Sequence, residues 1–240
     1  MPTTFLNLTN SLLRRLNEVE IAEAEFSGVR GVQSLSKDAV QNSINKINQA
    51  EYKWPFNAAE HTQVLAVGQE EYSWPSSFKV ADWNTFQLQK DDTLNTNHMT
   101  LQTISRDEYY NSHADLDDDS GTSGRGIPIY AWPGHGNGYG VSPSPDKAYT
   151  LKFRYYLQPT ALSNFSDTSR IPDTYDHVIL DGALYYMYMF RDNPEQAGVT
   201  SQLFLQGIKE MQGILINKYQ SVRDTRIQRQ RGLRTSFSNY

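Results

Sequence analysis

An acidic run, Asp115 to Gly121, has the residue types of a calcium-binding loop. An EF-hand loop places oxygen ligands at alternate positions, glycine at its sixth position and a bidentate glutamate at its twelfth. Here the sixth position is Ser120 and the twelfth is Gly126, so the pattern does not fit. We therefore expect a long, solvated acidic loop over residues 111–126, with a weak cation site as the alternative.

A glycine-rich segment, residues 134–140, has part of the spacing of a phosphate-binding loop. A dinucleotide fingerprint needs glycine at the sixth position of the motif and a helix directly after it. Tyr139 occupies the sixth position, and Ser142-Pro143-Ser144-Pro145 forbids a helix. We therefore expect the tip of a hairpin, whose glycines allow it to lie flat against a neighbouring surface.

The remaining reactive side chains form no recognisable catalytic or metal-binding motif. No two histidines lie at ligand spacing, and no serine lies in a nucleophile elbow. Carboxylate pairs carry little information in a chain with 27 acidic residues. We expect no catalytic residue, no metal ligand and no cofactor. The histidines are His61, His98, His113, His135 and His177.

Composition favours a soluble, acidic protein with a real core. The 240 residues carry a formal net charge of −5, which argues against a nucleic-acid binder as a whole. The absence of cysteine removes disulfides and thiolate metal sites. No apolar run approaches the length of a membrane span, and the N-terminus lacks a signal-peptide pattern. We therefore expect synthesis in the cytoplasm and no membrane contact.

The C-terminal segment, residues 223–240, is the only strongly basic part of the chain. It contains five arginines and one aspartate, whereas residues 107–119 contain six acidic side chains and no Lys or Arg. A solvated terminus, a salt-sensitive DNA contact and docking on an acidic groove of a partner are all open. Aromatic anchors would serve the last of these. The candidate contact residues are Arg223, Arg226, Arg229, Arg231, Arg234, Phe237 and Tyr240.

Helical periodicity dominates the residues before this segment. Ile171-Pro172-Asp173 predicts a helix start, and Asn193-Pro194-Glu195-Gln196 predicts a second start with Asn193 as N-cap. The second helix should run to Val222, about 28 residues and about 42 Å.

Two glycines, Gly182 and Gly207, fall on the apolar faces of these two helices. Glycine costs a helix about 1 kcal/mol relative to alanine, so a close approach is expected there. Packing within the hairpin is the preferred interpretation, and contact between subunits is the alternative. Leu203, Met211 and Ile214 share the apolar face of the second helix.

Two further helices and a set of strands precede the hairpin. Residues 4–19 and the residues after Ser36, up to Tyr52, have helical spacing, with Ser36 as the expected N-cap. Between residues 62 and 157 the pattern changes to short strands separated by turns, of which Tyr149 to Leu157 is the clearest. The expected fold is α+β: two helix pairs close a four-helix bundle around an inserted antiparallel β module. The expected parts are 1–55 and 166–222 for the bundle halves, 56–165 for the β module and 223–240 for an extended arm.

Several segments, in this order, resemble the head-to-tail adaptors of short-tailed bacteriophages, also called connectors or tail tubular protein A-like proteins. The similarity covers most of the chain from about residue 5 to about residue 222. The matching segments are Leu12-Leu13-Arg14-Arg15-Leu16-Asn17-Glu18, Ala39-Val40-Gln41-Asn42-Ser43-Ile44, Tyr52-Lys53-Trp54-Pro55-Phe56-Asn57, Gly68-Gln69-Glu70-Glu71-Tyr72-Ser73-Trp74-Pro75, Asp82-Trp83-Asn84-Thr85-Phe86, Tyr149 to Leu157, Ile171-Pro172-Asp173-Thr174-Tyr175 and Asp192-Asn193-Pro194-Glu195.

The resemblance implies a structural role in the virion and no enzymatic activity. Twelve copies would form a ring below the portal vertex, join the portal protein to the tail nozzle and line the DNA exit channel. The arm, residues 223–240, would dock on the portal, and the β module would face the nozzle or tail fibres. DNA would pass without specific binding, which suits a net acidic chain.

Two other functions remain open. The aromatic-rich β segment and the acidic loop are compatible with a tail-associated module that binds or hydrolyses glycan, through Asp117 to Asp119. DNA binding by the basic arm would be salt-dependent and would disappear when the chain is cut after Val222.

Overall fold

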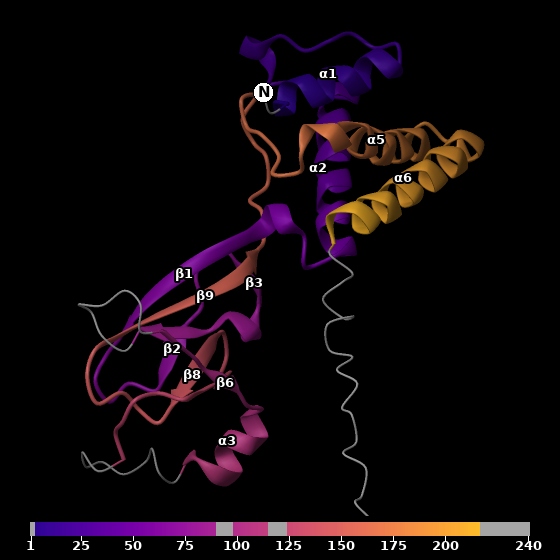
Figure 1. The fold of residues 1–240 in the computed structure, drawn as a ribbon. Coiled ribbons are helices and arrows are strands. Elements are labelled where there is room, and N and C mark those ends of the chain that lie inside the picture. The colour runs from indigo at the N-terminus through magenta and orange to yellow at the C-terminus, as the bar shows by residue number, and fades with distance from the viewer. Residues whose placement is uncertain (1–2, 90–97, 115–123, 217–240) are drawn as a thin grey trace, which may run out of the picture.

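The protein consists of a helical layer and a β module (Figure 1). The computed structural model describes residues 3–89, 98–114 and 124–216. Helices α1 and α2 precede the strands, and α5 and α6 follow them. This order confirms the predicted α+β class. None of the helices in these described ranges is long and apolar enough to cross a membrane.

Helix α1 (Phe5–Arg15) has defined caps at both ends. The Thr4 side chain accepts a hydrogen bond from the Asn7 N–H at its N-terminus. At its C-terminus Asn17 has a positive φ of 57°, and the Glu18 N–H donates to the Leu13 carbonyl at 2.9 Å. This Schellman arrangement ends the helix four residues before the predicted Val19.

Helix α2 (Val32–Ala50) begins earlier than predicted. Its N-cap is Gly31, whose φ of 62° is open to glycine and costly for other residues. Ser36 is therefore not the N-cap. It is fully buried inside the helix, and its hydroxyl donates to the Val32 carbonyl at 2.9 Å.

Four helices share one hydrophobic core. Helices α5 (Asp176–Phe190) and α6 (Pro194–Leu215) form the predicted hairpin, and α5 packs against α1 and α2. Figure 1 shows α2 running across α1 and α5 rather than alongside them, so a bundle of aligned helices is not confirmed. Fully buried members of this core are Leu12, Leu13, Val40, Ile47, Trp54, Ile179, Ala183 and Met211.

The β module contains two sheets that pack around an aromatic core. One sheet has the order β1-β9-β4-β5, with β3 also paired to β9, and the other has the order β2-β8-β7-β6. All pairings are antiparallel except β6 with β7. The strands are β1 (Ala58–Leu65), β2 (Glu71–Ser73), β3 (Phe78–Ala81), β4 (Gln87–Gln89), β5 (His98–Thr100), β6 (Gln102–Thr103), β7 (Tyr130–Pro133), β8 (Gly138–Ser142) and β9 (Tyr149–Leu157).

Strand β9 is the centre of the first sheet and has the predicted bounds. Its alternate residues from Tyr149 to Leu157 are buried, as a strand with one face on a core requires. It pairs with all eight residues of β1 on one edge and with β3 and β4 on the other.

Two predicted loops contain regular structure. Helix α3 (Arg106–Ser112) overlaps the start of the predicted acidic loop, and its N-cap Ser105 accepts from the Glu108 N–H at 3.1 Å. Residues 115–123, which include Asp117 to Asp119, lie outside the described residues. In the glycine-rich segment, only residues 134–137 form a turn, because Gly138 to Gly140 belong to β8. A Cβ on Gly140 would lie 2.1 Å from the ring of Trp132, so glycine is required there.

Candidate functional site

The hairpin between α5 and α6 is built by local signals. Asp192 has a φ of 54°, and the Asn193 N–H donates to the Tyr188 carbonyl at 3.0 Å, which ends α5 in a Schellman motif. Asn193 also caps α6, because its side chain accepts from the Gln196 N–H. The predicted start of α6 is therefore confirmed. Its predicted end is wrong, since α6 stops at Leu215 and Ile216 is extended.

The predicted packing residues separate onto two faces of the hairpin. Gly182, Gly207 and Met211 face the inside of the chain. A Cβ on Gly182 would lie 2.3 Å from Ser43 Oγ, and one on Gly207 would lie 2.8 Å from Val178 Cγ2. These glycines lie where α5 approaches α2 and α6 most closely.

Leu203 and Ile214 lie on the opposite, outer face of α6. Their side chains are 50% and 73% exposed, and Val199, one turn before Leu203, is 52% exposed. Gly198 and Gly213 also have open space around them. The outer face of α6, defined here by Val199, Leu203 and Ile214, is therefore an apolar surface that no described residue covers.

The C-terminal end of α2 brings three parts of the chain together. The last carbonyls of a helix have no partner within it. Here the Ile47 carbonyl accepts from Trp54 Nε1 at 2.9 Å, and the Asn48 carbonyl accepts from Lys79 Nζ at 2.6 Å. The Ala50 carbonyl accepts from Gln212 Nε2 at 3.4 Å. The connector to β1, strand β3 and the last turn of α6 thus meet at one helix end.

Lys79 is the charged member of this junction. Burial lowers the pKa of its ammonium group, and the nearby Glu51 carboxylate raises it in opposition. An ammonium beside helix carbonyls is also favoured by the helix dipole. The contact therefore links the β module to the helical layer through a partly desolvated cation.

A second polar cluster joins α3 to the turn between β7 and β8. His135 Nδ1 lies 2.8 Å from Glu71 Oε1, the Tyr110 hydroxyl lies 3.0 Å from His135 Nε2, and Tyr109 stacks on Trp132 at 3.9 Å. The sequence analysis missed this cluster, although Ser105 and Glu108 have the spacing of a capping box. Among the described residues, no group of three His, Cys, Asp or Glu side chains is placed to hold a metal ion.

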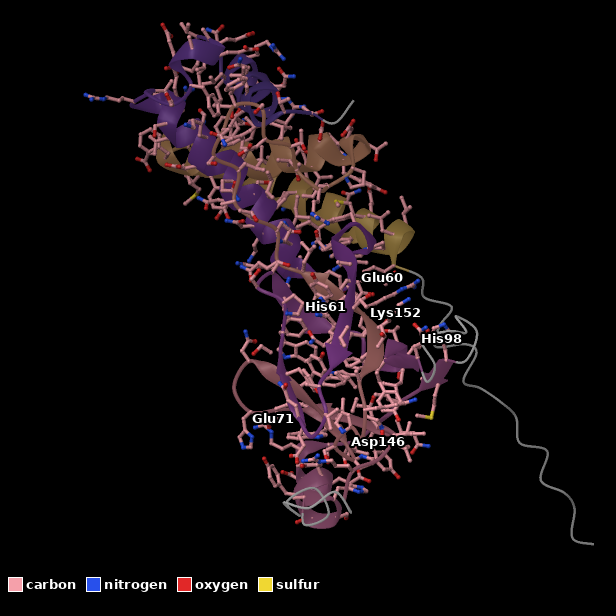
Figure 2. All side chains as sticks on the ribbon, turned by 90° about the vertical axis from the view of Figure 1, so that its left-hand side faces the viewer. Glu60, His61, Glu71, His98, Asp146 and Lys152 are labelled. Atoms are coloured by element: carbon pink, nitrogen blue, oxygen red, sulfur yellow. The ribbon has the colours of Figure 1, made fainter. Side chains whose placement is uncertain are left out.

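The outer face of the first sheet carries a shallow polar groove of about 290 Å³. Glu60 and Lys152 lie on this face and His61 on the opposite one (Figure 2). Arg154 Nε forms an exposed ion pair with Glu60 at 3.1 Å. The groove is lined by Glu60, His61, Thr62, Asn84, Thr85, Gln87, Lys152, Phe153 and Arg154.

The predicted arm residues, Arg223 to Tyr240, lie outside the described residues. What the geometry offers is a set of surfaces for protein contact: the outer face of α6 and the exposed faces of the β module. No set of side chains among residues 3–89, 98–114 and 124–216 brings together the nucleophile, base and orienting group of covalent catalysis.

Comparison with known proteins agrees with a structural role. No curated protein matches the chain. A family model described as SU10 adaptor protein matches residues 3–234, nearly the whole chain. This match supports the phage-adaptor part of the resemblance described above. The chain therefore belongs to the SU10 adaptor protein family, and it is a structural component of a bacteriophage virion.

Proposed function

We propose that the protein forms a ring, of twelve copies by resemblance to head-to-tail adaptors, that joins the portal protein to the tail nozzle. Membership of the adaptor family supports a structural place among head and tail components. The ring lines the DNA exit channel and performs no catalysis. A net charge of −5 supports passage of DNA without specific binding, because a channel of like charge does not retain the phosphates.

The observation that carries the ring is the outer face of α6. Its inner face is already filled by contacts at Gly207 and Met211, so Val199, Leu203 and Ile214 have no use in the packing of one chain. Apolar side chains exposed in a row along a helix mark a protein contact. In a ring this face meets a different face of the next copy, since a head-to-tail contact uses two distinct surfaces.

The other parts of the chain are assigned to the two ends of the ring. Residues 1–55 and 166–222 form the ring body, and residues 56–165 face the nozzle or tail fibres. The arm, residues 223–240, reaches the portal through its arginines and the aromatic residues Phe237 and Tyr240. Its start supports this assignment, because α6 delivers the chain directly to Ile216, six residues before the arm.

The test combines Leu203→Gln with Ile214→Gln in one chain. Both side chains are solvent-exposed, so the chain should keep its melting temperature within about 2 °C. Mixed with portal rings and followed by light scattering, the double variant should bind far fewer copies than the wild type. The matched control is Val67→Gln, which alters an equally exposed apolar residue in the β module.

A double variant that saturates the portal with the wild-type number of copies would remove the outer face of α6 from the ring contact. A loss of copies that the Val67→Gln control shows equally would also count against it.

A further inference from the structure

The β module is a nearly closed barrel with one open seam. The segment 98–104 supplies β5 to one sheet and β6 to the other, so the two sheets are continuous on that side. On the opposite side, β1 and β2 are consecutive strands joined by the turn 66–70, and they do not pair with each other. Strand β1 pairs with β9 alone. Among the described residues its other edge, about 26 Å long, carries no strand.

The backbone groups on this open edge can be identified by alternation. On β9, the Arg154 N–H donates to Thr85 Oγ1 and the Arg154 carbonyl accepts from Asp82, both on the side away from β1. Arg154 opposes Glu60, so this pair makes no ladder bonds. The even-numbered residues of β1 therefore direct their N–H and C=O groups outward. They are Ala58, Glu60, Thr62 and Val64.

Side chains close the two ends of this edge and leave its middle open. Beyond Val64, the Ala66 N–H donates to the Tyr72 hydroxyl at 3.0 Å. Before Ala58, the Phe56 carbonyl accepts from Arg170 Nη1 at 3.5 Å. Between them, Gln63 Nε2 donates to the Val64 carbonyl. Strand β1 has no proline, lysine or glycine, and its pairing has no bulge, so it lacks the usual protection of an edge strand.

We infer that the open edge of β1 accepts one extended segment of a different virion protein, which pairs with it as an added strand. This inference rests on the proposed adaptor function. Strand addition satisfies the outward groups and gives affinity, while alternate side chains give specificity. On the inner face, Ala59, His61 and Gln63 are half-buried at the seam, and the His61 ring packs 5.3 Å from that of Phe153. Apolar residues of the added strand cover this row.

Charge selects the partner. Glu60 is the only carboxylate of β1, and it lies on the outer face with its side chain exposed. Opposite charges across neighbouring strands are favourable. The added strand therefore carries Lys or Arg opposite Glu60 and apolar residues at the alternate positions.

The two other occupants fit less well. A second copy pairing β1 with β1 supplies no Lys or Arg for Glu60, and it closes a two-fold dimer rather than extending a ring. The chain's own arm has Arg223, Arg226, Arg229, Arg231 and Arg234 at both odd and even positions. As a strand it would place a charge against the half-buried inner row, which is costly without a partner.

The experiment uses an eight-residue probe peptide with Val at alternate positions, Thr between them and one Lys on the Thr face. Its control has Glu in place of Lys. Titration should slow hydrogen exchange at Glu60, Thr62 and Val64, and the Lys peptide should bind about fivefold more tightly than the Glu peptide. Thr62→Pro removes one outward N–H without touching the ladder to β9, and should weaken binding by about tenfold or more. Thr62→Val, which keeps the N–H, should bind like the wild type.

Three results would overturn the inference. The peptide could leave the outward amides unprotected, protect them equally in Thr62→Pro, or be displaced by a synthetic peptide of residues 217–240 at equal concentration. The melting temperature of Thr62→Pro confirms that the variant is folded.

A second measurement separates this inference from the proposed function. Hydrogen exchange of residues 58–66 is compared between the free chain and its complex with the portal and nozzle proteins of the same phage. Protection of the outward amides in the complex supports the inference. If light scattering shows the complex and these amides still exchange as in the free chain, the inference fails and the adaptor function stands. If no complex forms, the adaptor function fails, while the peptide titration still decides the edge.

Discussion

Glycine acts in this chain at two kinds of helical position, which sequence periodicity cannot separate. Gly182 and Gly207 lie in close contacts, whereas Gly198 and Gly213 lie in open space. All four occur in helices, and only the neighbouring elements distinguish them. The sequence therefore predicts a close approach at Gly182 and Gly207 but not which element makes it.

Gly207→Ala and Gly213→Ala should change stability in opposite directions. The new methyl at residue 207 would meet Val178, whose β-branched side chain is buried and has few other rotamers. Overpacking should outweigh the gain in helix propensity, for a net loss of about 1–2 kcal/mol. Gly213→Ala should gain up to about 1 kcal/mol. Urea unfolding measures both, and equal changes in the two variants would contradict the packing described here.

Tyr149 gives a prediction for alkaline pH. Its hydroxyl donates to Asp146 at 2.6 Å, and burial, this hydrogen bond and the Asp146 charge raise its pKa to about 12 from 10.0. The folded state thus holds the proton more tightly than the unfolded state. Its contribution to stability is complete below pH 10 and is lost as pH rises from 10 to 12.

Tyr149→Phe should therefore flatten the decline of stability between pH 10 and 12, while costing about 1 kcal/mol at pH 7 for the lost hydrogen bond. Urea unfolding at pH 8, 10 and 11 tests this. An unchanged slope would show that Tyr149 ionises alike in both states.

Elements whose signals are local could be predicted from the sequence. The start of α6 follows from Asn193 and Pro194, and β9 follows from strict alternation over nine residues. The start of α2 could not be predicted, because Gly31 reaches its left-handed conformation without a distinctive neighbour. Nor could the parallel pairing of β6 with β7, or the open seam beside β1, since both depend on contacts between distant segments.

The junction at the C-terminal end of α2 makes a prediction at the scale of elements. Lys79→Met keeps the apolar stem but removes the donor to the Asn48 carbonyl. We expect a loss of about 1–2 kcal/mol and faster hydrogen exchange at residues 48–57. The control is Lys152→Met on the exposed sheet face, which should change stability by less than about 0.5 kcal/mol. Similar effects from the two variants would mean that Lys79 does not link the β module to the helices.

At the scale of the whole molecule, the helical layer, the junction and the β module form a path between two ends of the chain (Figure 1). The layer carries the outer face of α6, and the β module carries the open edge of β1. A structural adaptor needs at least two such surfaces, one for its own copies and one for its neighbours. Neither surface could be located from the sequence, because exposure is a property of the folded chain.

The most direct test of the central claim is the mass of the complex formed when the purified chain is mixed with portal rings. Light scattering after size exclusion should show the portal mass increased by that of about twelve chains of 27.4 kDa. The chain cut after Val222 should remain folded and should not join the portal. A chain that stays a 27.4 kDa monomer beside unchanged portal rings would contradict the adaptor function.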